Sequence, residues 1–347
     1  MHRCLSGRWI QMLAGFAAIV ALAAPARAAD PVPLVFDTDI GNDIDDALAL
    51  AMIHALESRG ECHLLAVTIS KDNPYSATFV DLVNTFYGRP DIPIGLVHGG
   101  VAPQDSRYIR QPSLAQDDGH PRYPHRLADG RNALEAVAVL RKTLAAQKDG
   151  SVVMVQVGFS TNLARLLDSP AGADSPLGGL ALVRQKVRLL SIMAGSFSPG
   201  LAAKRYKEYN VAVDKASATK LFAAWPTPIV ASGFEIGAAI KYTARSIEED
   251  FRYVPHHPIR EAYELYAKMP YDRPTWDLTS TLYAVRPAQG YFELSPPGHI
   301  EVEPDGMTSF HAEPNGLHRY LILHPEQALR IREAMELLAS QPPEGKK

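Results

Sequence analysis

The residues most capable of chemistry lie in one short acidic segment, Asp37-Thr38-Asp39-Ile40-Gly41-Asn42-Asp43-Ile44-Asp45-Asp46. Five aspartates fall within these ten residues, directly after an apolar strand-like run and directly before a run of good helix formers. Carboxylates packed this closely repel one another unless a cation lies among them. Ca²⁺ accepts several carboxylate and carbonyl oxygens with tolerant geometry. A helix start that uses aspartate as a cap accounts for only one or two of the five acids, so the segment predicts a metal site.

The elements that must position this segment alternate between strand-like and helix-like runs. The alternation covers residues 33–36, 47–57, 64–69, 75–87, 92–97, 132–147, 151–157, 163–167, 187–193, 215–224, 228–231 and 326–339. Such alternation predicts an α/β fold with a mainly parallel, open, Rossmann-like sheet flanked by helices. Ligands bind outside the carboxyl ends of the strands in such sheets, where the acidic segment begins.

Two further features concern the organisation of the chain. Residues 99–130 form a long insertion rich in Pro, Gln, Asp, Arg and His, which is typical of a functional lid or a disordered loop. No composition shift or linker divides the rest, so we expect a single catalytic domain over residues 30–342.

The first 28 residues have the pattern of a signal peptide. Arg3 and Arg8 give a positive start, residues 9–24 are mostly apolar, and Ala26-Arg27-Ala28 has the pattern of a cleavage site. We therefore expect an exported protein, periplasmic or secreted. The leader carries three arginines and no acids, so its removal moves the net charge from −3 to −6.

The composition excludes several classes of protein. The chain has 35 Lys+Arg against 38 Asp+Glu, which argues against a general nucleic-acid surface. No run after the leader is long enough to span a membrane, so we expect no membrane association after cleavage. Cys4 leaves with the leader, and the remaining Cys62 cannot form an internal disulfide and is predicted to be a buried packing residue.

The acidic segment and three later motifs resemble one known family. The string Asp37-Thr38-Asp39-Ile40-Gly41-Asn42-Asp43-Ile44-Asp45-Asp46-Ala47-Leu48-Ala49-Leu50 resembles the N-terminal signature of the inosine-uridine nucleoside hydrolases. Residues 155–163, residues 208–214 and Asp277 resemble the later motifs of that family, in the same order. The resemblance covers about residues 33–340 and implies an N-glycosyl hydrolase that cleaves a ribonucleoside to ribose and free base.

The resemblance also implies a role for each matching residue. The Ca²⁺ ligands would be Asp39, Asp46, the carbonyl oxygen of Val157, and Asp277. Asp39 would also be the general base for a metal-bound water that attacks the anomeric carbon, which suits a reaction through an oxocarbenium-like state. The sugar would be held by Asp45, Met193, Glu208 and Asn210. Glu208 and Asn210 could instead be surface residues, and Met193 could instead be a core residue.

Two departures from the family pattern concern the first and last motifs. Asp39 and Asp45 are six positions apart, two more than in the family, so a pair around Asn42 and Asp43 is inserted and Asp43 could itself be a ligand. Trp276 stands before Asp277, where many members have a histidine that protonates the leaving base. Trp276 could stack on the base or could be a core residue. The candidates for an alternative acid are His98, His120, His125, Tyr108 and Tyr123.

Two other functions remain open from the sequence. Asp37 and Asp39 could act as nucleophile and acid of a metal-dependent phosphohydrolase, although this leaves Asp45 and Asp46 unexplained. A nucleoside- or ribose-binding protein on the same fold would also account for the motifs, because function resides in the site rather than in the fold. The chain could assemble as a homo-oligomer, and neither its oligomeric state nor its base preference follows from the sequence.

Overall fold

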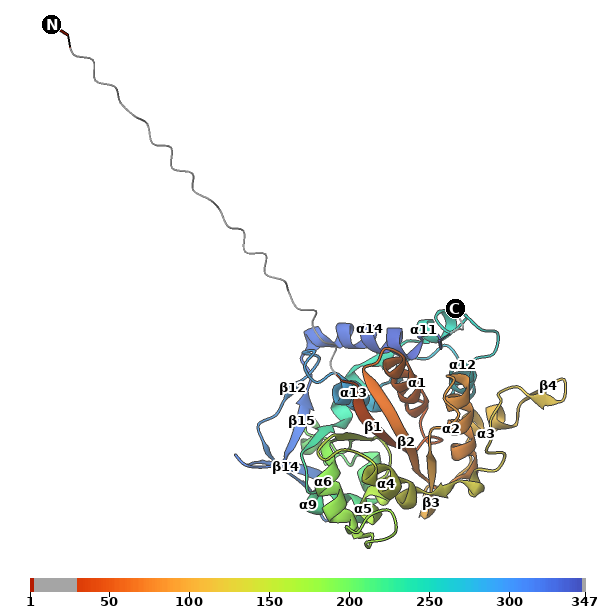
Figure 1. Cartoon of the computed structure of the whole chain (residues 1–347), viewed down its shortest axis with the longest axis horizontal. Coiled ribbons are helices and arrows are strands. Elements are labelled where there is room, and N and C mark those ends of the chain that lie inside the picture. Colours follow the sequence, from red (N-terminus) through yellow and green to blue (C-terminus); the bar gives the residue numbers. More distant parts are fainter. Residues whose placement is uncertain (3–29, 345–347) are drawn as a thin grey trace.

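Parallel strands form the centre of one large sheet (Figure 1). The computed structural model describes residues 1–2 and 30–344, so the predicted leader lies almost wholly outside the described residues. The parallel strands, in spatial order, are β6 (Leu134–Glu135), β3 (Ile94–Val101), β2 (Cys62–Lys71), β1 (Val32–Thr38), β7 (Val152–Gln156), β8 (Val187–Met193), β9 (Ile229–Ser232) and β15 (His318–Ile322). The predicted α/β fold with a mainly parallel sheet is confirmed.

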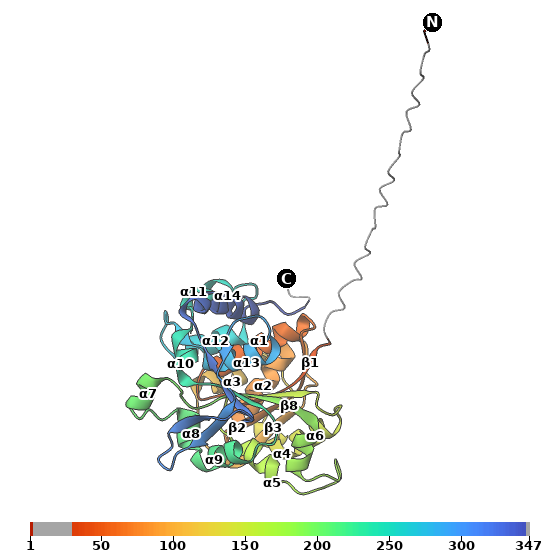
Figure 2. The same ribbon diagram turned by 90° about the vertical axis from the view of Figure 1, so that its left-hand side faces the viewer.

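Helices cover both faces of this sheet, as Figure 2 shows. Leu34 and Phe36 of β1 face one core, while Val35 between them faces the other, as the two-residue period of a strand requires. The first core includes residues from α1 (Asp45–Ser58), α2 (Pro74–Phe86), α12 (Pro258–Tyr266), α13 (Trp276–Val285) and α14 (Ala328–Ala339). The second includes residues from α4 (Ala136–Ala145), α5 (Thr161–Asp168), α6 (Gly179–Lys186) and α9 (Lys215–Ala224).

The order of the strands reverses between β1 and β7. From β1 the chain proceeds outward through β2 and β3, whereas from β7 it proceeds in the other direction through β8 and β9. β1 and β7 pair in register from Leu34 opposite Val153 to Asp37 opposite Gln156. The loops that follow the two strands therefore diverge and leave a crevice at their carboxyl ends, the usual ligand position in such sheets.

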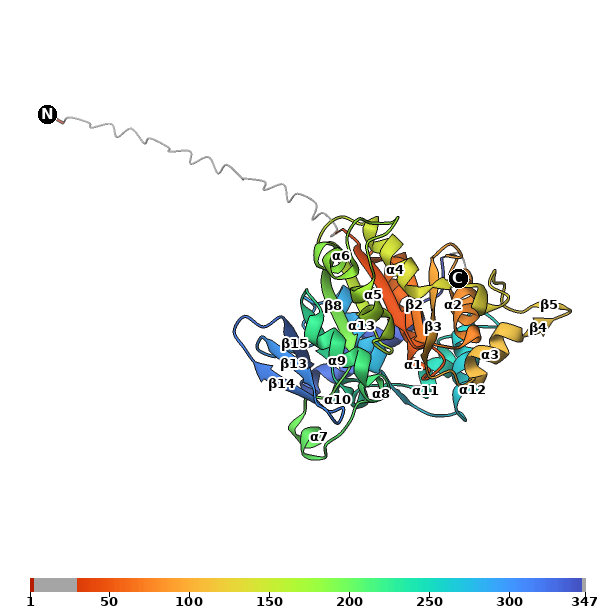
Figure 3. The same cartoon turned by 90° about the horizontal axis from the view of Figure 1, so that it is seen from below.

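The long insertion is more ordered than its composition indicates. Residues 99–130 include the end of β3, helix α3 (Arg107–Leu114) and a two-stranded ribbon of β4 (Gln116–Asp117) and β5 (His120–Pro121). Tyr108 and Ile109 of α3 are buried in the first core, which anchors the insertion to the domain. In Figure 3 the β4–β5 ribbon projects at one end of the molecule.

The helix expected over residues 132–147 begins only at Ala136. Leu134 and Glu135 pair with β3, and the Glu135 side chain then accepts a hydrogen bond from the Ala138 N–H as the helix cap. The preceding residues Gly130–Asn132 form a short 3₁₀ turn. The apolar pattern in this region therefore spans a strand and a helix.

The C-terminal part extends the sheet with antiparallel strands. β12 (Glu293–Leu294) and β13 (Gly298–Val302) pair antiparallel with β15, and β14 (Thr308–Ala312) pairs with β13. The remaining short helices are α7 (Pro199–Ala203), α8 (Tyr209–Val213), α10 (Phe234–Ala239) and α11 (Ala244–Glu249). Strands β10 (Lys241–Tyr242) and β11 (Arg273–Pro274) pair separately. No helix in residues 30–344 has the length and apolar content needed to cross a bilayer.

Candidate active site

A cavity of about 550 Å³ opens where the order of the strands reverses. Its wall comes from the acidic segment, the ends of β2, β7 and β8, the insertion, and the starts of α8, α10 and α13. The lining residues are Asp39, Gly41, Asn42, Asp43, Asp45, Asp46, Lys71, Gln104, Asp105, Ser106, Val157, Met193, Tyr206, Glu208, Tyr209, Asn210, Phe234, Trp276 and Asp277. All nine residues that the sequence assigned to the metal, the catalytic base and the substrate therefore line one cavity.

Three of the aspartates form a compact group that could hold a metal ion. Asp45, Asp46 and Asp277 are buried, and one oxygen of each lies within 4.8 Å of the others. Asp45 also accepts a hydrogen bond from the Asp277 backbone N–H at 3.1 Å, which joins the first turns of α1 and α13. Burial and then the charges of the neighbouring aspartates raise the pKa of all three carboxyls well above the ordinary value.

This electrostatic arrangement fits a bound divalent cation. No ion pair within residues 30–344 joins Asp45, Asp46 or Asp277 to a basic side chain. A buried group of three carboxylates without a paired cation is strongly unfavourable unless protons or a metal ion neutralise it. Oxygen donors of this kind are the ligands that hard divalent cations take.

Asp39 lies beside this group and is held by a chain of two hydrogen bonds. Asn42 donates from Nδ2 to Asp39 Oδ2 at 2.7 Å, and Lys71 donates from Nζ to Asn42 Oδ1 at 2.9 Å. Lys71 also donates to the carbonyl oxygen of Ala102 at 2.7 Å, so it ties β2 to the insertion. Burial raises the pKa of Asp39 to about 6, opposed by the Asn42 hydrogen bond and by the charge of Lys71.

The inserted pair in the acidic segment has partners of its own. The Asp43 carboxylate forms an ion pair with Arg273, whose Nε lies 2.9 Å from Asp43 Oδ1. The Tyr108 hydroxyl donates to the Asp43 carbonyl and accepts from the Gly41 N–H. Asp43 lines the cavity, but its carboxylate is neutralised by Arg273 rather than grouped with the other acids.

The predicted sugar residues meet at the ends of β7 and β8. Asn210 donates from Nδ2 to the Val157 carbonyl at 2.9 Å and approaches Met193 Sδ at 3.5 Å. Glu208 caps α8 and accepts hydrogen bonds from the backbone of Asn210, Val211 and Gly195. Burial raises the pKa of Glu208 to about 7, opposed by these hydrogen bonds. Glu208 and Asn210 are therefore buried in the cavity wall rather than on the outer surface, and Met193 belongs to both core and cavity.

Trp276 forms part of an aromatic wall. Its Nε1 donates to the Phe234 carbonyl at 2.9 Å, and its ring stacks on the Phe234 ring with centroids 5.4 Å apart. The Tyr206 ring packs against the Phe234 ring, with centroids 4.5 Å apart. Gly237 permits the close approach of α10, because a Cβ there would lie 2.3 Å from Trp276 Cα. Trp276 is thus fixed by packing while it borders the cavity.

The five candidate acids lie elsewhere. The Tyr108 hydroxyl donates to the Asp43 carbonyl in the acidic segment, and the Tyr123 hydroxyl donates to Glu261 Oε2 at 2.6 Å. His98 and His120 are exposed, and His125 contacts the Tyr123 carbonyl at 2.7 Å. None of them is among the described residues that line the cavity. The insertion supplies Gln104, Asp105 and Ser106 to the wall instead.

Asp37 serves the scaffold rather than the cavity wall. Its Oδ2 accepts hydrogen bonds from Thr68 at 2.5 Å and from Asn162 at 2.8 Å, and its side chain is buried. It joins β1 to β2 and α5, which leaves no access for a phosphate ester. A phosphohydrolase with Asp37 as nucleophile is not supported by this arrangement.

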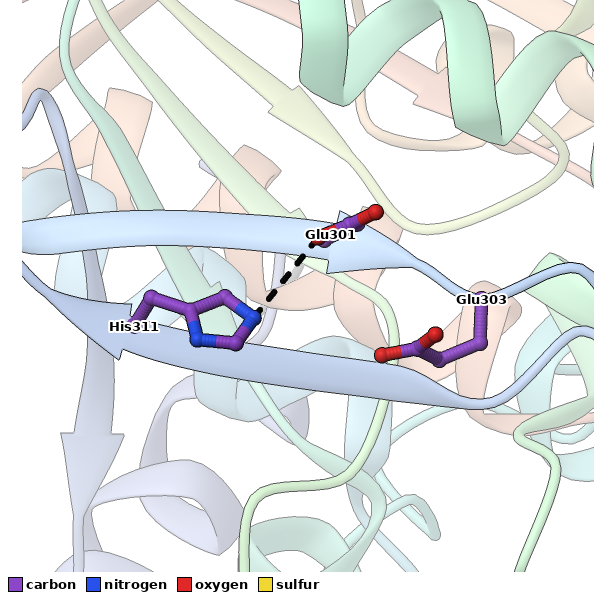
Figure 4. A group of neighbouring side chains, drawn as sticks. All are labelled: Glu301, Glu303 and His311. Carbon is purple, nitrogen blue, oxygen red and sulfur yellow. Dashed lines mark ion pairs between the residues drawn. The ribbon is translucent and has the colours of Figure 1, made fainter.

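A second group of potential metal ligands lies on the surface of the β13–β14 hairpin (Figure 4). His311 pairs with Glu301 at 3.6 Å, and both side chains are more than half exposed. Glu303 accepts a hydrogen bond from Ser309 at 2.7 Å. These groups are solvated and already paired, so the buried aspartates of the cavity are the stronger metal site.

The fold and the cavity together define an α/β enzyme with an acidic site that could hold a metal ion, at the point where the strand order reverses. The chain belongs to the inosine-uridine preferring nucleoside hydrolase family, whose sequence profile matches residues 34–327. The resemblance inferred from the motifs is confirmed, and the protein is an N-glycosyl hydrolase of the nucleoside hydrolase type. A search of curated protein sequences finds no match.

Solved structures with the same fold are numerous. A plant nucleoside hydrolase, PpNRh1, is 18% identical, with a TM-score of 0.64 over 90% of this chain and 100% of the other. A purine-preferring ribonucleoside hydrolase from Gardnerella vaginalis is 16% identical, with a TM-score of 0.64 over 89% and 99%. An inosine-uridine preferring nucleoside hydrolase from Bacillus anthracis is 14% identical, with a TM-score of 0.63 over 89% and 99%. At these identities the similarity establishes the fold.

Proposed function

We propose that the protein is an exported, Ca²⁺-dependent hydrolase that cleaves ribonucleosides to ribose and free base, with Asp39 as the general base. The observation that carries the proposal is the group of unpaired buried carboxylates beside Asp39 on one cavity. The signal-peptide pattern of residues 1–28 supports export.

The residues that would hold the ion are Asp39, Asp46, Asp277 and the Val157 carbonyl, with Asp45 close enough to contact both the ion and a sugar hydroxyl. When bound, Ca²⁺ would orient a water molecule beside the sugar and lower the pKa of that water. All of these ligands are oxygen atoms, and Ca²⁺ accepts a variable number of oxygen ligands. The site therefore favours Ca²⁺ over transition metals, which prefer nitrogen and sulfur ligands.

In this proposal, Asp39 would accept the proton of the attacking water. Burial raises the pKa of the Asp39 carboxyl, which makes it a stronger base than a carboxylate in water and favours proton transfer from the water. The hydrogen bond from Asn42 Nδ2 occupies Oδ2 and leaves Oδ1 for other contacts. The negative charge of the surrounding carboxylates also favours the positive charge that develops on the ribose ring.

In this proposal, Glu208 and Asn210 would bind the hydroxyls of the sugar. Three backbone N–H groups fix the Glu208 carboxyl, and the Val157 carbonyl fixes the Asn210 amide. Because both side chains are oriented before substrate arrives, little rotamer entropy is lost on binding. Met193 supplies an apolar surface beside them.

The test is release of reducing sugar from inosine, adenosine, guanosine, uridine and cytidine by residues 29–347. The assay is run with Ca²⁺, with chelator, and with Mg²⁺ after chelation. We expect release that Ca²⁺ supports and chelator removes, and the panel gives the base preference. Full activity in chelator would contradict the proposed metal dependence, and inactivity towards all five would contradict the proposed substrate class.

A further inference from the structure

We infer that the best substrates are nucleosides whose base already carries a positive charge, such as N-ribosylpyridinium compounds. This inference rests on the proposed function, because it assigns the leaving group to the same cavity. Three observations carry it: the proton donors of the cavity, its charge, and its aromatic wall.

The first observation is that the cavity lacks a suitable proton donor for the leaving nucleobase. None of the described residues that line the cavity is a histidine or a cysteine. Burial raises the pKa of Tyr206 to about 12 and also raises the pKa of Tyr209, which makes both poor acids near neutral pH. The Lys71 ammonium already donates hydrogen bonds to Asn42 and Ala102. The Glu208 carboxylate accepts hydrogen bonds from three backbone N–H groups, which favour its ionised form.

The chemistry of the bond then selects the leaving group. A neutral nucleoside releases its base as an anion, which needs a proton from an acid of suitable pKa. In an N-ribosylpyridinium, water adds to C1′ as the C1′–N bond breaks, and the bonding electron pair neutralises the pyridinium nitrogen. Asp39 takes the proton of the water, and the base leaves as a neutral pyridine. Atoms and charge balance without a leaving-group acid.

The second observation is the charge of the cavity. Seven acidic side chains line it, against Lys71 as the single basic residue among the described lining residues. Arg273 pairs with Asp43 and Arg110 pairs with Asp105, which leaves five lining carboxyl groups without an ion pair. An excess of negative charge therefore remains when a divalent cation is counted, and a cavity of one sign concentrates ligands of the other. The same field disfavours phosphorylated nucleotides.

The third observation is the aromatic wall of Tyr206, Phe234 and Trp276. The three rings pack in sequence, with centroids 4.5 Å and 5.4 Å apart. Aromatic faces attract cations, and tryptophan does so most strongly. Trp276 already carries the guanidinium of Arg273 over its ring at 5.3 Å, while that guanidinium is paired with Asp43. All three residues line the cavity, so a base bound there meets aromatic side chains, which attract a charged base more strongly than a neutral one.

The experiment compares nicotinamide riboside, a cation, with uridine and inosine on the Ca²⁺-loaded enzyme at about 20 mM and about 300 mM salt. We expect kcat/KM for nicotinamide riboside to exceed the other two by about tenfold or more. We also expect it to fall by about threefold at the higher salt concentration while the values for uridine and inosine change little, because only the cation is attracted by the field. This salt dependence separates attraction by the enzyme from the intrinsic lability of the pyridinium bond.

A charge variant at the mouth of the cavity gives an independent measurement. Asp105→Asn removes one lining charge, which pairs with the half-exposed Arg110 at 3.4 Å and belongs to neither the metal group nor the sugar contacts. We expect its KM for nicotinamide riboside to rise by about threefold, and by more than its KM for uridine. Asp174→Asn, which removes an equal charge from an exposed loop away from the cavity, should change neither.

The outcomes separate this inference from the proposed function. Ca²⁺-dependent cleavage of uridine or inosine that exceeds cleavage of nicotinamide riboside would overturn the inference and leave the proposed function standing. Equal salt dependence for charged and neutral substrates would also overturn it. Inactivity towards all three substrates in folded protein would overturn both.

Discussion

Gly158 follows β7 and packs against the backbone of Thr38 and Asp39 at the end of β1, so it adjoins the proposed catalytic base. A Cβ at this position would lie 2.4 Å from the Asp39 backbone nitrogen and 2.7 Å from the Thr38 carbonyl carbon. It would also lie 2.5 Å from Ser70 Oγ, which itself bonds the Thr38 carbonyl and the Phe159 N–H. Two of the three contacts are with backbone, so rotation of a side chain cannot relieve them.

The expected size of the effect follows from these distances. Non-bonded heavy atoms are optimally separated by about 3.5–4.0 Å, so Gly158→Ala requires the ends of β1 and β7 to separate by about 1 Å. A displacement of about 1 Å at a reacting group can lower the rate by about 10²-fold. Overpacking of this kind costs about 1–3 kcal/mol of stability, which a domain of this size tolerates. We therefore predict a folded protein in which kcat is about 10²-fold lower.

The assay is steady-state hydrolysis of the best nucleoside of the panel, with the melting temperature measured on the same preparation. Gly172→Ala is the matched control, since a Cβ there has no atom within 4 Å and the residue has no positive φ. The control should retain wild-type kcat. A Gly158→Ala enzyme with kcat within about threefold of wild type would refute the argument that this contact positions Asp39.

Three further predictions concern other parts of the molecule. Lys71→Met removes the hydrogen-bond donor to Asn42 Oδ1 and to the Ala102 carbonyl oxygen. Because hydrogen bonds from a charged group are lost, we expect kcat/KM in steady-state assays to fall by about 10–100-fold. An unchanged kcat/KM would show that Asn42 does not need Lys71 to hold it in place. His54 is buried, and burial lowers its pKa to about 3. Below about pH 6.5 the imidazole is therefore protonated in the unfolded chain but stays neutral in the folded protein, which lowers the free energy of unfolding. His54→Phe removes this penalty, and its deficit in unfolding free energy should shrink by about 2 kcal/mol between pH 8 and pH 5 in urea titrations; a constant deficit would contradict the buried neutral imidazole. Ca²⁺ at about 1,000 times its Kd should stabilise the chelated protein by about 4 kcal/mol in thermal melts, whereas an unchanged melting temperature would argue against a specific metal site.

The sequence was most informative where local pattern determines structure. The acidic segment and its flanking strand and helix follow from short runs of residues, and the cavity forms at the strand end where α/β topology requires it. The start of α4 was misplaced because the apolar pattern continues through β6, while the cap by Glu135 depends on where β6 leaves the sheet.

The partners of the inserted pair could not be predicted, because they are distant in sequence. Asn42 is held by Lys71, and Asp43 by Arg273, which follows 230 residues later. No periodicity links such positions, and only the folded domain brings the end of β2 and strand β11 to the acidic segment. Lys71 had a weak signal, as a lysine at the end of an otherwise apolar strand.

The part of the site that would contact the leaving nucleobase was predicted least well. The three histidines and two tyrosines proposed as acids follow the composition of the insertion, but the direction of each side chain depends on how α3 and the β4–β5 ribbon pack. Tyr206 and Tyr209 had a signal that could have been used, because they flank Glu208 in the motif that resembles the sugar-binding segment. The roles of the metal and sugar residues stay predictions.

The central claim is that Asp39 is the general base of a nucleoside hydrolase, and Asp39→Asn tests it most directly. The amide keeps the shape of the side chain and an oxygen for the metal, but it cannot accept the proton of the water. The measurement is kcat for the best substrate at saturating Ca²⁺, on protein whose Ca²⁺-induced rise in melting temperature equals that of wild type. We predict a loss of about 10²–10⁴-fold. A kcat within about tenfold of wild type would contradict the account and would assign the proton transfer to another group.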